Sequence, residues 1–220
     1  MKWLYTIGAI VFFAKVLIFP SLAAPVASES AVDLIFQDGG VSNTVSGVVF
    51  RNRLYDTLFE VIVFTLAIMG VRFLMANEQP VQTVRQFTDP PSVILARLGA
   101  TVTALIGIEL AIRGHLSPGG GFAAGIAGGT AIGLIAITAS TAQMEEIYQR
   151  WHAATWEKIS VLLFIVIAVL MLSGLALPMG TPGSLLSGGW IPILNCLVAL
   201  KVALGSWAAV LIFVRYRGLL

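Results

Sequence analysis

Several ionisable side chains interrupt long apolar stretches of this sequence. In RNRLYDTLFEVIVF, Asp56 and Glu60 are four residues apart and share one helical face, with Arg53 three residues before Asp56. Arg53 and Asp56 could form a simple solvated ion pair. Glu60 lies about 10 Å further along the helix than Arg53, where its carboxyl group must find a cation or take up a proton. That chemistry is typical of a proton or sodium relay, and pairing with another subunit is the structural alternative.

Two further charged sites come later in the chain. Glu109 and Arg113 in GIELAIRGH are four residues apart in the favourable order, acid before base, and could be a structural clamp or part of a transport path. Lys201 in NCLVALKVALG has no carboxylate on its own helix, so we expect a partner on another helix or a neutral amine. A transport role and a packing role are both open for Lys201, and Asn195 could hold water near it.

A glycine-rich segment, RGHLSPGGGFAAGIAGGTAIG, separates two of the apolar stretches. Its turn combines Pro118 with Gly119, Gly120 and Gly121, which permits positive φ angles and a close backbone turn before a helix N-terminus. A phosphate cradle is disfavoured, because the turn is expected outside the cytoplasm and no lysine follows the glycines. His115 could titrate near neutral pH at an ion entrance, or it could be structural.

Small residues continue along the helix that follows this turn. Gly121, Gly125, Gly129 and Gly133 recur at four-residue steps, so one helical face is bare backbone. In lipid, such a face lets a neighbouring helix approach closely. We therefore predict a packing surface for a partner helix at Gly125, Gly129 and Gly133.

Long apolar stretches must position these side chains. The chain of 220 residues is 58% hydrophobic and only 11% charged, whereas soluble domains have about 25% charged residues. Because a helix needs about 20 apolar residues to cross a hydrocarbon core of about 30 Å, we predict an all-α membrane protein with about six transmembrane helices. The predicted spans cover residues 3–24, 54–76, 93–112, 121–140, 158–178 and 190–214. Their unbroken apolar runs exclude a β-barrel, whose strands alternate in polarity.

The first apolar stretch, residues 3–24, could also be a signal peptide, because Lys2 precedes it and small residues lie near Ala24. Lys15 within it and the five later spans favour a retained helix. Lysines and arginines near the span ends predict that both termini are cytoplasmic, in a cell (inner) membrane. The cytoplasmic side then holds Lys2, Arg72, Arg85, Arg97, Arg150, Lys158, Arg215 and Arg217, and the outside holds Arg51, Arg53 and Arg113.

Two long loops, residues 25–50 and 77–92, divide the chain. The second ends in a double proline, which marks the start of a new helix. We therefore predict a two-helix segment at residues 1–85 and a four-helix domain at residues 86–220.

The loop at residues 140–157 is predicted to form an amphipathic surface helix, with Trp151 and Trp156 at the membrane interface. The single cysteine, Cys196, excludes an intrachain disulfide. The sequence has no phosphate-binding loop, dinucleotide fingerprint, cysteine metal cluster or basic patch with interleaved aromatic residues. These observations predict no cofactor, no metal and no nucleic-acid partner.

Two stretches of the sequence resemble one family of complexes. RGHLSPGGGFAAGIAGG resembles the signature of the MnhB/MrpB-like subunit of the Mrp-type multisubunit Na+/H+ antiporters, whose size and layout match the helices from about 93 to 217. GGVSNTVSGVVFRNRLYDTLFEVIVFTLAIMGV resembles the tail of the large, MnhA/MrpA-like component of those antiporters, where a DTLGE-type motif opens the last helix. Archaeal membrane-bound hydrogenases carry that tail as a separate small subunit.

The resemblance implies a non-catalytic accessory subunit in a hetero-oligomeric membrane complex, beside antiporter subunits that move Na+ and H+. Asp56 and Glu60 match the acidic pair of the MrpA-like tail, and His115 with the 118–121 turn matches the MrpB-like signature. Lys201 lies where MrpB-like subunits tend to carry a lysine. The implied ion path uses Glu60 as the relay, with Lys201 or Glu109 tuning it.

Two departures from the family pattern leave the function open. Phe59 replaces the glycine that usually precedes the motif glutamate, which favours a hydrogenase-like or divergent branch. WHAATWEKISV lacks the aspartate-containing pattern of MrpB-like subunits, so we expect an ion ligand there to be lost. An antiporter component, the same module in a membrane-bound redox complex, and a purely structural assembly component are the three alternatives.

Overall fold

The computed structural model of the chain describes residues 30–81 and 83–219. The chain divides into two units, residues 1–34 and 35–220. In the first unit, the described residues contain only the start of helix α2 (Ala31–Gly39). The predicted first span and its signal-peptide alternative lie outside the described residues.

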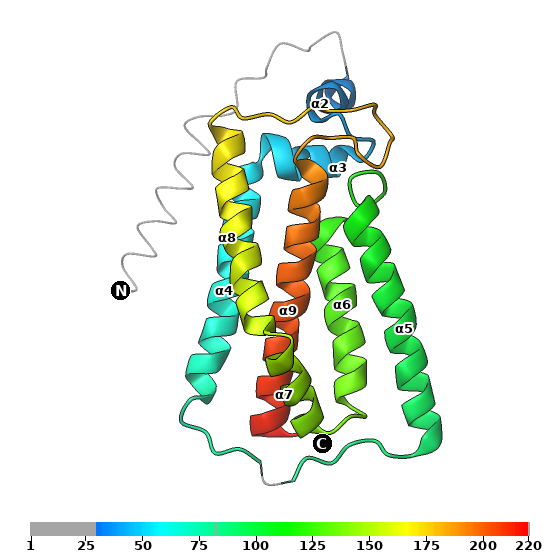
Figure 1. Ribbon diagram of the computed structural model, residues 1–220, viewed down its shortest axis with the longest axis vertical. Helices are drawn as coiled ribbons and strands as arrows, with labels where there is room; N and C mark the ends of the chain where they lie inside the picture. The colour runs from blue at the N-terminus through cyan, green and yellow to red at the C-terminus, as the bar shows by residue number, and fades with distance from the viewer. Residues whose placement is uncertain (1–29, 82, 220) are drawn as a thin grey trace, which may run out of the picture. The chain divides into compact units, whose positions relative to one another are not determined.

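The regular secondary structure in the described residues of the second unit is helical, as the sequence predicts, and Figure 1 shows how the helices are arranged. After α2 come α3 (Thr44–Gly47), the π-helical turn η1 (Val48–Asn52), α4 (Leu54–Met75), α5 (Pro90–Arg113), α6 (Gly120–Ala136), α7 (Thr141–Arg150), α8 (Ala153–Leu172) and α9 (Ile191–Arg217).

Four of these helices, α4, α5, α8 and α9, are long and apolar enough to cross a membrane. They confirm the predicted spans at 54–76, 93–112, 158–178 and 190–214, with shifted ends for some of them. Helix α6 has 17 residues and ends at Ala136, so it is shorter than the predicted 121–140 span.

Local signals explain where α5, α7 and α8 begin. The Asp89 carboxylate accepts a hydrogen bond of 3.0 Å from the backbone N–H of Ser92 at the start of α5, and the bonds to Ser92 lower the pKa of Asp89. Ser140 caps α7 by accepting from the N–H of Gln143 at 3.2 Å. His152 has φ 49°, a left-handed conformation that separates α7 from α8.

This left-handed residue corrects two predicted boundaries. The surface helix covers Thr141–Arg150 rather than residues 140–157, so Trp156 belongs to α8. Helix α8 begins at Ala153, five residues before the predicted span, and ends at Leu172 rather than residue 178. As a result, Glu157 lies inside a membrane-length helix instead of in a surface loop.

Helix α9 lies at the centre of this unit and packs against α4, α5, α6 and α8 (Figure 1). The apolar core joins α9 to α4, α8 and η1. Its fully or nearly fully buried members include Phe50, Leu54, Val61, Phe164, Ala168, Leu194, Val198 and Val202. Because α4 packs on α8 and α9, it shares this core with the predicted four-helix domain, and the predicted boundary at residue 85 stays a prediction.

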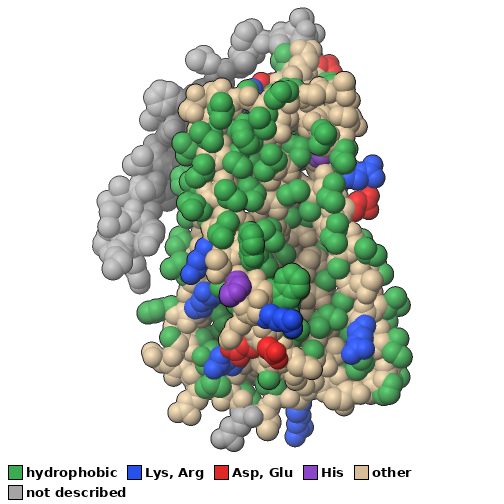
Figure 2. All heavy atoms as spheres, viewed as in Figure 1, with side chains coloured by type: hydrophobic (Ala, Val, Ile, Leu, Met, Phe, Trp, Pro, Cys, Tyr) green, Lys and Arg blue, Asp and Glu red, His purple; other side chains and the backbone are tan. Residues whose placement is uncertain are grey.

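The last residues of α9 lie beside two connecting segments. The backbone N–H of Val81 donates to the Arg215 carbonyl at 2.9 Å, and Arg215 pairs with Glu145 of α7 at 3.1 Å. Arg217 pairs with Glu78 at 3.1 Å. We call this end of the unit, made by residues 77–89, 137–150 and 213–219, the basic end. Figure 2 shows lysine and arginine side chains gathered toward it.

The other end of the unit is closed by loops and short helices. Asn43, at the start of α3, donates from its backbone N–H to the His115 carbonyl at 3.1 Å and from its amide to the carbonyls of Gly114 and Ser117. Ser46 also donates to the Gly114 carbonyl, at 2.7 Å. We call this end, made by residues 40–47, 114–119 and 177–190, the loop end.

Candidate functional site

A buried ion pair joins α8 to α9 near the middle of α9. Lys201 is 1% exposed and Glu157 is 6% exposed, and the Lys201 ammonium donates a hydrogen bond to a carboxylate oxygen of Glu157. Of the alternatives left open for Lys201, the structure therefore contains the partner on another helix. A buried charge is costly unless an opposite charge lies beside it, so each of the two side chains needs the other to stay charged.

Glu157 is the site residue that the sequence analysis missed. It belongs to one buried face of α8, together with Ala153, Ser160, Phe164 and Ala168, at the three- and four-residue steps of a helix. That spacing could have identified Glu157, had the span been started at residue 153. The segment lacks the aspartate-containing pattern, but Glu157 brings a carboxylate to Lys201. The expectation that an ion ligand is lost there stays a prediction.

Gly205 makes room for the groups around this ion pair. It lies one turn after Lys201 on α9, where an added Cβ would come within 2.5 Å of the Phe64 ring and 3.4 Å of a Glu157 carboxylate oxygen. The Phe64 ring, from α4, has its centroid 5.2 Å from the Lys201 nitrogen, within cation–π range. Three helices thus meet around one ammonium group.

The ion pair is reached from a pocket of about 300 Å³ between α4, α8 and α9. Glu157 and Lys201 line it, together with Thr65, Arg72 and Lys158. Arg72 and Lys158 come from the halves of α4 and α8 nearer the basic end. Apolar side chains, Ile68, Met69, Val161, Leu162 and Ile165, make up the rest of the lining, so the opening toward the buried pair is mostly apolar.

Glu60 lies in a second pocket of about 210 Å³, toward the loop end. The same pocket is lined by Thr57, Asn43 and the turn at Pro118, Gly119, Gly120 and Gly121. The structure thus brings Glu60 together with the predicted glycine-rich turn. Glu60 itself is exposed at the surface of the described residues rather than enclosed.

Two aromatic rings connect the surroundings of these sites. Phe64, one turn after Glu60, contacts Lys201 on one side and packs edge-to-face against Phe122, with ring centroids 6.2 Å apart. Phe122 also lines the Glu60 pocket. The Phe64 and Phe122 rings therefore link the surroundings of Lys201 to the Glu60 pocket through apolar contacts.

Asp56 pairs with Arg53, three residues before it on the chain. The Arg53 Nε donates to the Asp56 carboxylate at 2.6 Å, and the Arg53 side chain is mostly exposed. This is the solvated ion pair that the sequence allowed. Although Asp56 and Glu60 are four residues apart, Asp56 does not line the Glu60 pocket.

His115 is fully buried at the loop end, beneath residues 184 and 185, instead of at an open ion entrance. Within the described residues, neither ring nitrogen has a hydrogen-bond partner of good geometry. Burial lowers the pKa of His115, and the nearby backbone of Ser184 and Leu185 offsets part of this effect. The imidazole is therefore held neutral at physiological pH.

Asn195 is also fully buried and fastens α9 to α5. Its amide nitrogen donates to the carbonyls of Leu110 and Ala111 at 3.1 and 2.6 Å. These bonds satisfy the last carbonyls of α5, which have no helical partner. Asn195 therefore has a structural role at the end of α5. Its Oδ1 has no partner among the described residues, and the expectation that Asn195 holds water stays a prediction.

Comparison with known proteins gives the family. A family model described as a domain related to the MnhB subunit of Na+/H+ antiporter matches residues 91–208, more than half of the chain. The chain belongs to this family. It is a multi-pass membrane protein, and Glu157 and Lys201 both lie within the MnhB-related region.

Two individual proteins are also similar to the chain. A probable K+/H+ antiporter A/B subunit from Rhizobium meliloti (strain 1021) is 29% identical over 153 residues, which cover 58% of this chain and 15% of that protein. A chain in the structure of the membrane-bound sulfane sulfur reductase, an archaeal respiratory membrane complex, matches with a TM-score of 0.66 at 23% identity. That match covers 97% of this chain and 98% of the other, so the two share a fold.

The MnhB-related region also contains the glycine face of α6. Added Cβ atoms at Gly121 and Gly125 would collide with Asn195 and Val202 of α9, and one at Gly129 would lie 2.6 Å from the Ser206 Cβ. At Gly133, an added Cβ would meet nothing within 4 Å among the described residues. The close approach of α6 to α9 therefore stops before Gly133.

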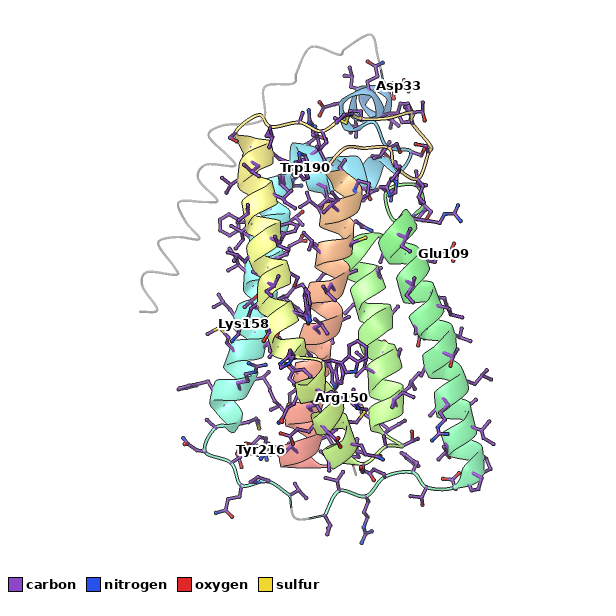
Figure 3. The ribbon with its side chains drawn as sticks, viewed as in Figure 1. Asp33, Glu109, Arg150, Lys158, Trp190 and Tyr216 are labelled. Carbon is purple, nitrogen blue, oxygen red and sulfur yellow. The ribbon has the colours of Figure 1, made fainter. Side chains whose placement is uncertain are left out.

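Glu109 and Arg113 form the predicted i,i+4 pair on α5, with 3.5 Å between the charged atoms. Both side chains are more than half exposed. Figure 3 shows Glu109 on α5, across the unit from the labelled Lys158 of α8. This pair is therefore remote from the buried one.

Within residues 30–81 and 83–219, no three His, Cys, Asp or Glu side chains cluster as metal ligands would.

Proposed function

We propose that this chain is an accessory subunit of a multisubunit Mrp-type antiporter that exchanges a monovalent cation, Na+, for protons. It would contribute to the ion path and to assembly, without a catalytic centre of its own. The buried Glu157–Lys201 pair carries this proposal, because an intramembrane ion pair is costly and defaults to a functional interpretation. Membership of the MnhB-related family and the similarity to an antiporter component support it.

The proposed path runs between the two ends of the described unit, with the basic end in the cytoplasm as the lysine and arginine distribution predicts. At the loop end, Glu60 would take up or release the cation or proton in its pocket. Protonation of Glu157 would weaken its hold on Lys201, freeing the ammonium to shift in response. The Phe64 and Phe122 rings would keep the Glu60 step and the Lys201 step from being joined by a continuous water column.

A second candidate is the same module in a membrane-bound redox complex, where separate subunits transfer electrons. The nearly full-length likeness to a chain of an archaeal respiratory membrane complex favours it, as does Phe59 in place of the motif glycine. The subunits that co-purify with this chain decide between the two. Nickel-iron or iron–sulfur subunits would identify the redox complex, and only antiporter-like subunits would identify the antiporter.

The double variant E157Q/K201M tests the proposed ion path. It removes both buried charges while keeping side-chain volume, so neither helix is left with an unpaired charge. We expect the variant complex to assemble and to lose sodium-dependent pH change in everted vesicles. The control E109Q/R113M removes the exposed pair and should retain transport. Normal transport by the assembled E157Q/K201M complex would leave only the structural role for this ion pair.

The Glu60 step has its own test. E60Q keeps the side-chain volume and the polar contacts of the pocket but cannot exchange a proton at neutral pH. We expect assembly to be unchanged and sodium-dependent pH change to be lost. If transport by E60Q matched that of the unaltered complex, Glu60 would not be the relay, and an inert surface role would remain.

A further inference from the structure

A pocket that this path does not use lies at the basic end. It has a volume of about 340 Å³ and is bounded by the end of α4, by α7 and by the last turns of α9. Its polar lining includes Arg72, Thr141, Glu145, Tyr148 and Arg215. With Tyr216, which also lines it, the pocket contains two guanidinium groups and three hydroxyl groups from three helices.

Two of the hydroxyl groups that line this pocket, those of Tyr148 and Thr141, are buried. The oxygens of Tyr148 and Thr141 are shielded from solvent, and within the described residues neither hydroxyl group donates to an acceptor; the Arg72 guanidinium lies close to the Tyr148 oxygen. Burial raises the pKa of Tyr148, an effect that the nearby Arg72 guanidinium partly offsets, so the phenol stays protonated and can donate. Buried hydroxyl groups without partners are rare, because each costs free energy unless a ligand or water binds it.

The balance of charge in the pocket favours an anion. Arg215 pairs with Glu145 at 3.1 Å, so these two charges largely cancel. Arg72 makes no ion pair with any residue in the described ranges, which leaves one positive charge uncompensated. A guanidinium beside hydroxyl donors is the donor set that binds phosphate oxygens.

The apolar lining indicates where the phosphate comes from. Met75, Leu211 and Ile212 also line the pocket, and they belong to the ends of the membrane-length helices α4 and α9. Arginines at such helix ends lie at headgroup depth, and basic pockets between spans on the cytoplasmic side bind anionic lipid headgroups. An apolar wall continuous with the spans accommodates the acyl chains of a lipid, which a free phosphate does not have.

We propose that this pocket binds the phosphate of an anionic phospholipid headgroup, with Arg72 as the charge partner and the hydroxyl groups of Tyr148 and Thr141 as donors. Arg72 also lines the pocket that leads to Glu157 and Lys201. A bound headgroup would therefore lie next to the route to the buried ion pair. The binding itself does not require that the chain transports ions.

Lipid binding to the purified full chain, with the subunits that co-purify with it, tests this inference. Short-chain phosphatidylglycerol and phosphatidylcholine are titrated separately, and retained lipid is counted by native mass spectrometry. We expect phosphatidylglycerol to bind at least about tenfold more tightly than phosphatidylcholine. R72Q should weaken phosphatidylglycerol binding about tenfold, and Y148F about fivefold. The matched control R97Q removes an exposed arginine of α5 that does not line the pocket, and should change nothing.

Three results would overturn the inference. One is equal binding of phosphatidylcholine and phosphatidylglycerol. Another is phosphatidylglycerol binding by R72Q and Y148F that is as tight as binding by the R97Q control. The third is displacement of phosphatidylglycerol by millimolar inorganic phosphate, which would identify a free phosphate as the ligand. Y148F keeps the ring and its edge-to-face contact with Trp207, so it tests the donor even if R72Q fails to assemble.

Discussion

The two acid–base pairs of the MnhB-related region differ in where their charges lie. Glu109 and Arg113 are four residues apart on α5, with side chains 64% and 56% exposed. Glu157 and Lys201 are 44 residues apart on two helices, with side chains 8% and 1% exposed. The first pair follows from helical spacing alone, and the second exists only because α8 and α9 pack together.

This difference decides what each pair contributes. An exposed helical pair is screened by solvent and stabilises a protein by about 0.3–0.5 kcal/mol. A buried pair has a large desolvation cost that its mutual attraction offsets, so its net contribution is small but the loss of one partner is severe. The i,i+4 spacing in the sequence therefore identified the pair whose disruption costs less free energy.

The single variant E157Q should have the largest effect, because it leaves the Lys201 charge buried without a counter-charge. We expect a loss of about 3–5 kcal/mol in the free energy of unfolding, measured by denaturation of the purified protein in detergent. The double variant E157Q/K201M should recover most of that loss. A single variant as stable as the unaltered protein would contradict the dependence of each buried group on the other.

Gly205 offers a way to disturb the buried pair without changing a charge. In G205A the new methyl group would press on the Phe64 ring, which lies against Lys201, so we expect a loss of about 1–3 kcal/mol in the free energy of unfolding. The control G133A adds the same methyl group to α6 where nothing lies within 4 Å among the described residues. It should be neutral or slightly stabilising, because alanine favours helix over glycine. Equal effects of the two would contradict the packing around Lys201.

His115 extends the comparison to a buried group without a counter-charge. Burial lowers its pKa in the folded protein, so the unfolded chain binds the proton more readily. Its contribution to stability is then fully present above the unfolded pKa of about 6.5. It is lost as pH falls from that value toward the folded pKa.

Melting temperatures of the unaltered protein and of H115N at pH 7.5 and 5.5 test this. We expect the unaltered protein to lose a few degrees more than H115N between the two pH values. An equal loss in both proteins would mean that His115 is not the group responsible.

The exposed pair should give the smallest effect. E109Q should change the free energy of unfolding by less than about 0.5 kcal/mol, and raising the salt concentration should remove even that difference. Thermal denaturation at low and high salt measures it. A loss comparable to that of E157Q would mean that a neighbouring subunit buries this face of α5.

Much of the fold followed from hydropathy and proline rules. The spans of α4, α5 and α9 were placed closely because long apolar runs must be helical in lipid, and the double proline marked the start of α5. The start of α8 was misplaced because a left-handed His152 carries no sequence signal comparable to glycine or proline. As a result, the prediction placed Glu157 in a surface helix instead of in the membrane-length helix α8.

The candidate site was only partly predictable. Lys201 stood out because an apolar span has no reason to contain a lysine, and a partner on another helix was among the expectations for it. Which helix supplies the partner depends on the rotation of α8 about its axis, which sequence spacing alone does not determine. The burial of His115 and the use of Asn195 to cap α5 likewise depend on how the loop end closes over these residues.

The glycine face of α6 has a mechanical consequence. With almost no side chain between them at Gly121, Gly125 and Gly129, the backbones of α6 and α9 are in near contact, so any side chain added there would push the two helices apart. The α4 and α8 sides of α9 are separated from it by whole side chains, which can change rotamer. The α6–α9 contact is therefore made largely by backbone, whereas the α8–α9 contact that contains Glu157 and Lys201 is made by side chains.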